Sequence, residues 1–235
     1  MSPRSLAAVF ARTPLHPQWL LGRRVVPNGL AEARGIVLDV GSADSWIAAH
    51  LDAEVHYVSV DTPATGKTLY GAKPVVFADG MKLPFRDASV DSAICLEVAE
   101  HVSDPQTLLL EISRVLKPGG QLFISAPFLY PIHDAPHDFQ RFTRHGLQYL
   151  VERAGLRILG IESRVGSINI AGTLACLAIA GPFSAGGWRL LLLPFAAMMV
   201  LVINLAAYIL SLFWPNWDAM TFGYVLRAVK PEYHA

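Results

Sequence analysis

The sequence predicts an α/β fold, in which helices cover both faces of a mostly parallel sheet and a hydrophobic helical insertion precedes the last strand. Short β-branched runs alternate with helix-capable segments from residue 35 onward, which is the pattern of strands joined by crossover helices. Residues 105–116 repeat apolar side chains at helical spacing. Between residues 165 and 217 the only charged side chain is Arg189, and the whole chain is 16% charged, against about 25% in an ordinary soluble domain.

This interpretation divides the chain into four segments. They are a helical N-terminal preface (1–34), a core (35–164), the hydrophobic insertion (165–218), and the last strand with the C-terminal tail (219–235). In the preface, apolar residues at helical spacing are interrupted by Pro14 and Pro17.

The expected strands are short runs rich in β-branched residues. They cover Ile36–Val40, Val55–Val60, Val75–Phe77, Ala93–Leu96, Gln121–Ser125, Arg157–Glu162 and a final run near Met220–Val229. The clearest helix follows Asp104, which can cap it, with Pro105 in the first turn and the sequence Pro-Gly-Gly at 118–120 ending it. A second helix is expected over Thr143–Ala154.

The insertion contains one segment, Leu190–Phe213, that has the length of about 20 apolar residues needed to cross a bilayer. A second stretch, Ile168–Trp188, is interrupted by Gly181-Pro182 and fits a second span, a re-entrant piece or an interfacial segment. Because the last strand must return to the sheet, a helical hairpin with Arg189 near its tip is the simplest arrangement. Insertion into one leaflet and an unusually apolar buried helix pair are the alternatives.

Charge and cysteine content exclude some classes. Nineteen basic and nineteen acidic residues balance, so no nucleic acid partner is expected. Cys95 and Cys176 show neither metal-ligand nor redox spacing, and both are expected to be buried in a reducing compartment. The apolar run "SLAAVFA" after Arg4 is too short for a signal peptide, which favours a membrane-associated chain whose core is cytoplasmic.

The turn after the first strand, "VLDVGSADSW", has features of a ligand-binding loop. Gly41 lets a ligand approach the backbone, and Asp39 can orient the loop or meet a cationic group. About twenty residues later the second strand ends at Asp61, an acid that can accept both hydroxyls of a ribose. A tight turn with a helix cap would explain the same residues without a ligand. A dinucleotide-binding dehydrogenase is rejected, because only Gly41 of its G-x-G-x-x-G pattern is present.

Three further motifs follow in a fixed order. Asp79-Gly80 comes after the third strand, the fourth strand ends at Glu97, and "VLKPGGQLFISAP" leads into the fifth. Over roughly Gly35–Glu162, with the final strand, the sequence closely resembles the class I S-adenosylmethionine-dependent methyltransferases, specifically the methyltransferase type 11 branch. The resemblance implies a Rossmann-like three-layer sandwich with a mixed, mostly parallel seven-stranded sheet, and S-adenosylmethionine as the cofactor.

The family's cofactor contacts, carried over residue by residue, fall on Asp39, Gly41, Ser42 and Ala43 for the methionine moiety, on Asp61 for the ribose, on Asp79, Gly80 and Met81 for the adenine, and on Glu97 beside the fourth strand. The sequence departs from the family where Ala43 and Ser45 replace two glycines, and side chains there restrict the backbone and weaken the expected binding. His101 is a residue that the family often has, expected either near the cofactor or in a structural role.

The polar stretch "PFLYPIHDAPHDFQRFT" begins at the carboxyl end of the fifth strand, where open α/β sheets place substrates. A histidine there can take a proton near neutral pH, and an arginine can clamp an anionic group. The candidate catalytic residues are His133, His137, Asp138 and Arg141. The alternative is that these side chains pair with one another and serve the turns of the loop. No metal site is expected, because Pro136 disfavours the helix that would bring His133 and His137 to one face.

The sequence therefore predicts an S-adenosylmethionine-dependent methyltransferase that acts at a membrane on a small or lipid-linked acceptor, with membrane lipid as a partner. One alternative is a catalytically inactive, membrane-anchored scaffold that keeps the fold. The other is a soluble methyltransferase in which the insertion is an apolar cap over the substrate.

Overall fold

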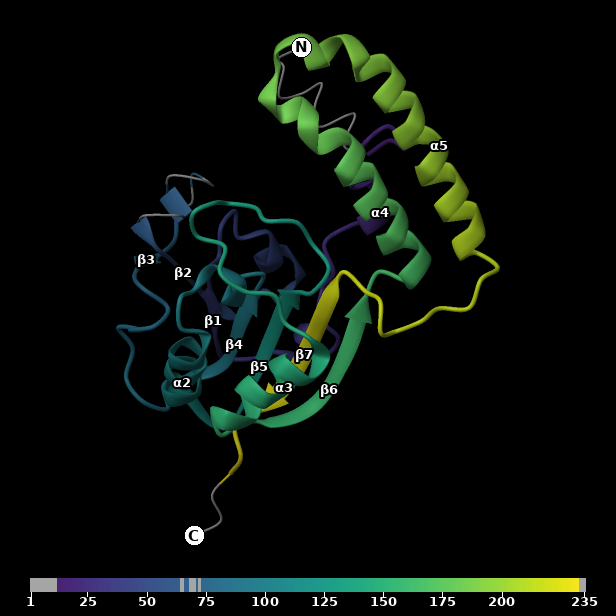
Figure 1. The fold of residues 1–235 in the computed structure, drawn as a ribbon. Helices are drawn as coiled ribbons and strands as arrows, with labels where there is room; N and C mark the ends of the chain where they lie inside the picture. The colour runs from purple at the N-terminus through teal and green to yellow at the C-terminus, as the bar shows by residue number, and fades with distance from the viewer. Residues whose placement is uncertain (1–11, 64–65, 68–70, 72, 233–235) are drawn as a thin grey trace. The chain divides into compact units, whose positions relative to one another are not determined.

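The computed structural model describes residues 12–63, 66–67, 71 and 73–232, and its strands form one seven-stranded sheet (Figure 1). The strands are β1 (Ile36–Val40), β2 (His56–Asp61), β3 (Val76–Phe77), β4 (Val90–Leu96), β5 (Leu116–Pro127), β6 (Arg157–Arg164) and β7 (Gly223–Val229). Their order is β3-β2-β1-β4-β5-β7-β6; the pairs from β3 to β5 are parallel, and β7 is antiparallel to β5. The predicted mixed, mostly parallel sheet is confirmed.

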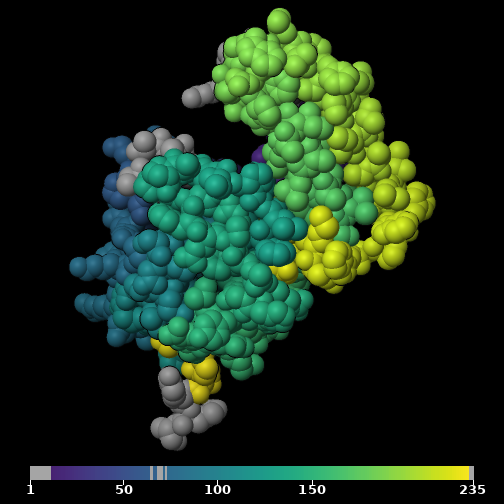
Figure 2. Space-filling view, viewed as in Figure 1, coloured from purple at the N-terminus to yellow at the C-terminus, as the bar shows by residue number. Residues whose placement is uncertain are grey.

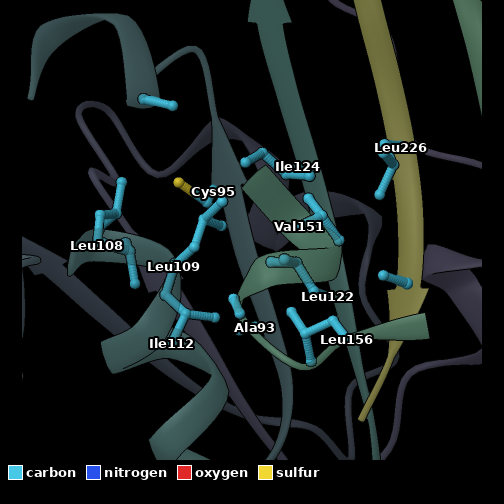
Figure 3. Close-up of a cluster of buried hydrophobic side chains, with 14 of the residues drawn as sticks. Ala93, Cys95, Leu108, Leu109, Ile112, Leu122, Ile124, Val151, Leu156 and Leu226 are labelled. Carbon is cyan, nitrogen blue, oxygen red and sulfur yellow. The ribbon is translucent and has the colours of Figure 1, made fainter. Parts of the chain in front are cut away.

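One face of the sheet carries two α-helices, α2 (Pro105–Val115) and α3 (Arg144–Arg153). Asp104 caps α2 as expected, with Oδ1 accepting the N–H groups of Gln106 and Thr107 at 3.1 Å each. Apolar side chains of both helices interdigitate with those of the strands, and each buried aliphatic chain stabilises the fold by about 1.5–3 kcal/mol. Figure 3 shows part of this core, with Leu108, Leu109 and Ile112 from α2, Val151 from α3, Leu122 and Ile124 from β5, and Leu226 from β7.

Among the described residues, short 3-10 turns pack on the opposite face of the sheet. A smaller core of Leu30, Ala33, Val37, Ile47, Ile94 and Phe123 lies there, with Leu30 from η2 (Leu30–Glu32) and Ile47 from η3 (Trp46–His50). The helix expected after the first strand is therefore only η3, which begins after a left-handed Ser45 and ends at an extended Leu51. In the described residues 12–34 the expected helical preface is reduced to η2 and η1 (Trp19–Leu21).

The chain divides into two compact units. One comprises Val25–Glu162 with the described part of Gly223–Ala235, and it holds the sheet. The other comprises the described part of Met1–Arg24 with Ser163–Phe222, and it holds the hydrophobic insertion.

The insertion is a helical hairpin in the part of the chain that the structure describes. Its arms are α4 (Ser167–Ala180), extended by η6 (Gly181–Ala185), and α5 (Leu193–Ser211), preceded by η7 (Gly187–Leu192), which contains Arg189. The helices approach closely at Gly172, where an added Cβ would lie 2.7 Å from the Cβ of Ala207. Figure 2 shows their side chains forming one continuous packed surface.

Two buried polar side chains inside this unit, Asn204 and Cys176, form hydrogen bonds. Asn204 of α5 is fully buried, and its amide nitrogen donates to the carbonyl oxygens of Pro14 at 2.6 Å and His16 at 2.9 Å. The thiol of Cys176 in α4 donates to the Asn204 side-chain oxygen at 3.5 Å. Asn204 therefore attaches the N-terminal segment to the hairpin, which explains a polar residue in an otherwise apolar helix.

Both arms of the hairpin have the length and composition of membrane-crossing segments. These segments are Ser167–Ala185, with 19 residues, and Gly187–Ser211, with 25, and only 22% of an apolar 18-residue stretch within each is buried. Large apolar side chains on α5 face outward, among them Phe195, Met198, Val202 and Ile209. Buried helices of soluble proteins are covered on most sides, so the exposure of these arms is compatible with a lipid environment.

Candidate functional site

The carboxyl ends of four adjacent parallel strands gather the polar residues of the sheet at one edge. Asp39 lies near the end of β1, Asp61 ends β2, Glu97 follows β4, and the polar loop follows β5. The topology therefore places the expected cofactor residues and the expected acceptor loop at the same edge.

The loop after β1 keeps a glycine-like backbone although it has lost two glycines. Gly41, Ala43 and Ser45 all have positive φ values, of 75°, 45° and 53°. Gly41 is also required by space, because an added Cβ would lie 2.4 Å from a methyl group of Val98. Ala43 and Ser45 adopt the left-handed conformation at a cost of about 1–2 kcal/mol each. Ala43 and Ser45 thus adopt the positive φ values that glycines at these positions would adopt more readily.

Asp61 connects this loop to the end of β2. Its carboxylate is 6% exposed, and it accepts the backbone N–H of Ala43 at 2.8 Å and that of Thr62 at 2.7 Å. Gly66 packs directly against the carboxylate, and a side chain at this position would lie 2.2 Å from Asp61 Oδ1. Each carboxylate oxygen has a second lone pair, so Asp61 retains the capacity to accept two further hydrogen bonds.

Asp39 is a second buried carboxyl group beside the loop. Its Oδ2 accepts the hydroxyl of Tyr57 at 2.5 Å. Burial raises the pKa of Asp39 to about 6, and the charges of Asp61 and Asp44 add to this effect against the hydrogen bond from Tyr57. The hydroxyl oxygen of Ser42, between Gly41 and Ala43, is buried without a hydrogen-bond partner in the described structure. A cationic ligand would stabilise the ionised form of Asp39, and a polar ligand could form the missing hydrogen bond with the Ser42 hydroxyl.

Asp79, Gly80 and Met81 form a turn after β3. The Asp79 Oδ1 atom accepts the N–H of Met81 at 2.9 Å, so this carboxylate stabilises its own turn. Gly80 is packed against α2, because an added Cβ would lie 2.8 Å from a methyl group of Leu108.

The segment after β4 contains two acidic residues that differ in hydrogen bonding and burial. Glu97 has a φ of 54° and accepts the hydroxyl of Ser125 at 2.6 Å. Glu100, in η5 (Ala99–His101), is completely buried, and neither carboxyl oxygen has a hydrogen-bond partner in the described structure. Burial raises the pKa of Glu100 well above its usual range; the charge of Glu97 adds to this, while Arg141 opposes it. Sequence reasoning missed Glu100, whose only signal is its place beside His101 in the motif "EVAEHV".

The loop after β5 is held together by Arg141. The guanidinium forms a bidentate ion pair with Asp138, with N–O distances of 2.5 and 2.7 Å. Its other three N–H groups reach the carbonyl oxygens of Tyr130, Pro131 and Gln140 at 2.7–3.0 Å. All five donors of Arg141 therefore have partners inside the loop, and Arg141 hydrogen bonds hold the pKa of Asp138 down at about 2.

The structure brings three of the four candidate catalytic residues together. The Oδ2 of Asp138 accepts the backbone N–H of His133 at 2.8 Å and lies 3.4 Å from its ring Nδ1. The fourth candidate, His137, interacts through its backbone: its carbonyl oxygen lies 2.7 Å from Nδ1 of His101. The rings of His101 and His133 meet edge to face, with centroids 4.7 Å apart. His101 thus joins the acceptor loop to the end of β4.

Part of the sheet unit matches a known protein family. Residues 38–124 match the family described as "Methyltransferase domain". An uncharacterized methyltransferase of Mycobacterium avium (strain 104) is 41% identical over 107 residues, which cover 42% of each chain. One from Mycobacterium tuberculosis (strain ATCC 25618 / H37Rv) is 42% identical over 130 residues, covering 52% of this chain and 48% of that protein. The chain thus matches less than half the length of these curated relatives.

Solved structures share the fold at low sequence identity. Phosphoethanolamine N-methyltransferase 2 of Haemonchus contortus, in complex with S-adenosyl-L-methionine, has a TM-score of 0.52 and 14% identity, over 99% of this chain and 60% of that one. The cyclase SpnF has a TM-score of 0.53 and 20% identity, over 86% and 77% of the two chains. Since one neighbour is by name a cyclase, the fold alone does not fix the reaction.

Proposed function

We propose that this chain is a class I S-adenosylmethionine-dependent methyltransferase that methylates a small or lipid-linked acceptor at a membrane. The match of residues 38–124 to a methyltransferase family supports the methyltransferase part of the proposal. The observation that carries the proposal is the hydrogen bond between Asp61 and the N–H of Ala43, which joins the acid at the end of β2 to the loop after β1. These are the two elements to which the family resemblance assigns cofactor binding.

The residues at this edge suit S-adenosylmethionine chemically. Asp39 and Asp61 are buried carboxyl groups that would meet a cationic ligand and a ribose diol, and the unpartnered hydroxyl of Ser42 could pair with a polar group. Asp79–Met81 would receive the adenine, and Glu97 would line the site from β4. Gly66 packs on the Asp61 carboxylate, and a side chain at this position would collide with it.

When bound, S-adenosylmethionine supplies a methyl group that leaves its sulfonium sulfur as the acceptor bonds to the carbon, with the C–S electron pair remaining on sulfur. The protein's part is to position the acceptor and to remove a proton from it. His133 is the proposed base, with Asp138 fixing its backbone at 2.8 Å. Arg141 acts through Asp138 as a positioning residue, since its donors are all used within the loop. His137 would position His101 through its carbonyl oxygen.

The hairpin supports the membrane part of the proposal. Two arms of sufficient length, with outward-facing apolar side chains, would anchor the chain in lipid. A lipid-linked acceptor would then lie in the same membrane as the anchored chain. The sheet unit would be on the cytoplasmic side, with Arg189 in the connection between the two arms.

The test is a calorimetric titration of S-adenosylmethionine and S-adenosylhomocysteine into the purified chain and into Asp61→Ala. We expect the parent to bind, and the variant to bind at least about tenfold more weakly, because hydrogen bonds to a charged group contribute about 1.5–3 kcal/mol each. The exposed Glu54→Ala is the matched control and should bind like the parent. An analogue that lacks the ribose hydroxyls sharpens the result, since only the parent should discriminate against it. A folded parent that binds neither ligand would refute the cofactor assignment and favour the inactive scaffold.

A further inference from the structure

Three potential metal ligands from two separate segments meet beside the acceptor loop. Glu100 and His101 lie in η5 after β4, and His133 lies in the loop after β5. One ligand atom from each residue lies within 4.8 Å of the other two, and Glu100 Oε1 is 3.8 Å from His101 Nε2. Two ligands bound to one ion at about 2.1 Å each are at most about 4.2 Å apart, so small side-chain rotations would bring all three into coordination.

Glu100 is the residue that points to a ligand. Its side chain is completely buried, and both oxygens lack hydrogen-bond partners in the part of the chain that the structure describes. An isolated buried carboxylate is strongly unfavourable, and buried charges in proteins are normally paired or coordinate a metal. Arg141, whose charge acts to lower the pKa of Glu100, has all of its donors committed elsewhere.

The two histidines are oriented as metal ligands are. Nδ1 of His101 lies 2.7 Å from the carbonyl oxygen of His137, so Nδ1 carries the proton and the lone pair of Nε2 faces Glu100. Nδ1 of His133 lies 3.3 Å from the carbonyl oxygen of Pro131, and 3.4 Å both from Asp138 Oδ2 and from Nη2 of Arg141. Metal-bound histidines typically use one ring nitrogen for the metal and give the other to a carbonyl or carboxylate, which fixes the ring.

We propose that Glu100, His101 and His133 form a binding site for a divalent first-row metal ion, with coordination positions left open for a ligand. Two imidazoles and one carboxylate are the donor set of catalytic zinc sites and of the facial triads that bind iron(II). This proposed metal site differs from the sequence-based expectation of no metal, which was based on His133 and His137 as the two histidine ligands. The tertiary structure pairs His133 with His101 instead.

The site suggests which acceptors suit the chain, and this step rests on the proposed function. A cation beside the loop after β5 would polarise an oxygen atom bound in its open positions and lower the pKa of a hydroxyl. With the ion bound, this effect would replace His133 as the means of deprotonating the acceptor, because a metal-bound imidazole cannot accept a proton. Acceptors that present a hydroxyl group are therefore favoured over amines, which are protonated and cationic near neutral pH.

Metal binding can be measured without the cofactor. The purified chain, stripped with a chelator and exchanged into metal-free buffer, is titrated with Zn²⁺ and with Mn²⁺ by calorimetry, and with Co²⁺ by visible absorption. We expect one ion per chain. Glu100→Gln and His133→Gln, which retain side-chain size, should weaken binding by more than the 10- to 100-fold typical of outer-shell substitutions. His145→Gln, at an exposed position in α3, is the matched control and should leave it unchanged.

Circular dichroism and melting of each variant establish that it is folded, and the ion should raise the melting temperature of the parent and of His145→Gln only. The proposal would be overturned if the folded parent bound no ion, or if Glu100→Gln and His133→Gln bound the ion as tightly as the parent does. Titration of S-adenosylmethionine on the same samples separates the two proposals. Metal binding without cofactor binding would leave the metal site standing while the proposed function fails.

Discussion

Asp138 and Arg141 form a bidentate ion pair in which the carboxylate is 1% exposed and the guanidinium 22%. The pair lies three residues apart in a loop without regular secondary structure and is connected to three backbone carbonyl groups. It therefore fixes the path of the loop that carries His133.

Replacing Arg141 should loosen this loop more than the rest of the fold. Arg141→Met leaves the nearly buried Asp138 carboxylate without its partner, and loss of charged hydrogen bonds costs about 1.5–3 kcal/mol each. We expect amide hydrogen exchange at His133, whose N–H is bound to Asp138, to accelerate by at least about tenfold. Arg144→Met, at an exposed position, is the control, and equal exchange rates in both variants would contradict the role of the pair.

The conformation of Ala43 predicts how the loop responds to substitution. With a φ of 45°, Ala43→Gly relieves about 1–2 kcal/mol of backbone strain but gives the unfolded chain more freedom, by about 0.4–1 kcal/mol. A net gain in stability of about 0.5 kcal/mol is expected. Ala43→Val should instead lose more than about 1 kcal/mol, because a β-branched residue disfavours this region. Urea denaturation followed by fluorescence measures both; a parent less stable than Ala43→Val would contradict the strain argument.

Asp39 predicts a pH dependence of stability. Its pKa of about 6 in the folded chain lies above the usual value of 3.8, so the folded state holds the proton more tightly between these values. Stability contributed by the protonated form is fully present below pH 3.8 and is lost as the pH rises through 6. Asp39→Asn should remove this loss and stabilise the chain at pH 7.5 by up to about 3 kcal/mol. Melting temperatures of both proteins from pH 4 to 8 test this; parallel curves would exclude an elevated pKa at Asp39.

The outward-facing residues of α5 allow the membrane proposal to be tested. Val202 is 58% exposed, and an arginine at the centre of a membrane-crossing helix costs about 3 kcal/mol relative to valine. Val202→Arg should therefore reduce the fraction of the chain that remains in membranes after a carbonate wash. Arg157→Ala, on β6 in the sheet unit, should not change this fraction. A parent chain that is soluble without detergent would favour an apolar cap instead of an anchor.

Several features of this protein could be derived from sequence patterns because they depend on nearby residues. The cap at Asp104 follows from local hydrogen bonding, and the positions of the strands follow from β-branched runs. The strand lengths did not follow, since β4 and β5 are longer than the expected Ala93–Leu96 and Gln121–Ser125. Placing Asp39 and Asp61 at one edge also needed only the parallel order of the strands that they end. Sequence patterns failed where they did not distinguish an α-helix from a 3-10 helix. In η3, the five residues between Ser45 and Leu51 form a 3-10 turn rather than an α-helix.

The sequence by itself determined the sheet, the edge that carries Asp39 and Asp61, and the apolar hairpin, since each follows from a periodic pattern or an ordered motif. Only the tertiary structure decided that Glu100 and His101 lie beside His133 and that Arg141 serves the loop. The physical reason is that β4 and β5 pair in parallel, so segments separated by a whole helix and strand emerge at neighbouring positions of one edge. No local sequence pattern predicts that these segments lie side by side, because their proximity depends on how the intervening α2 packs.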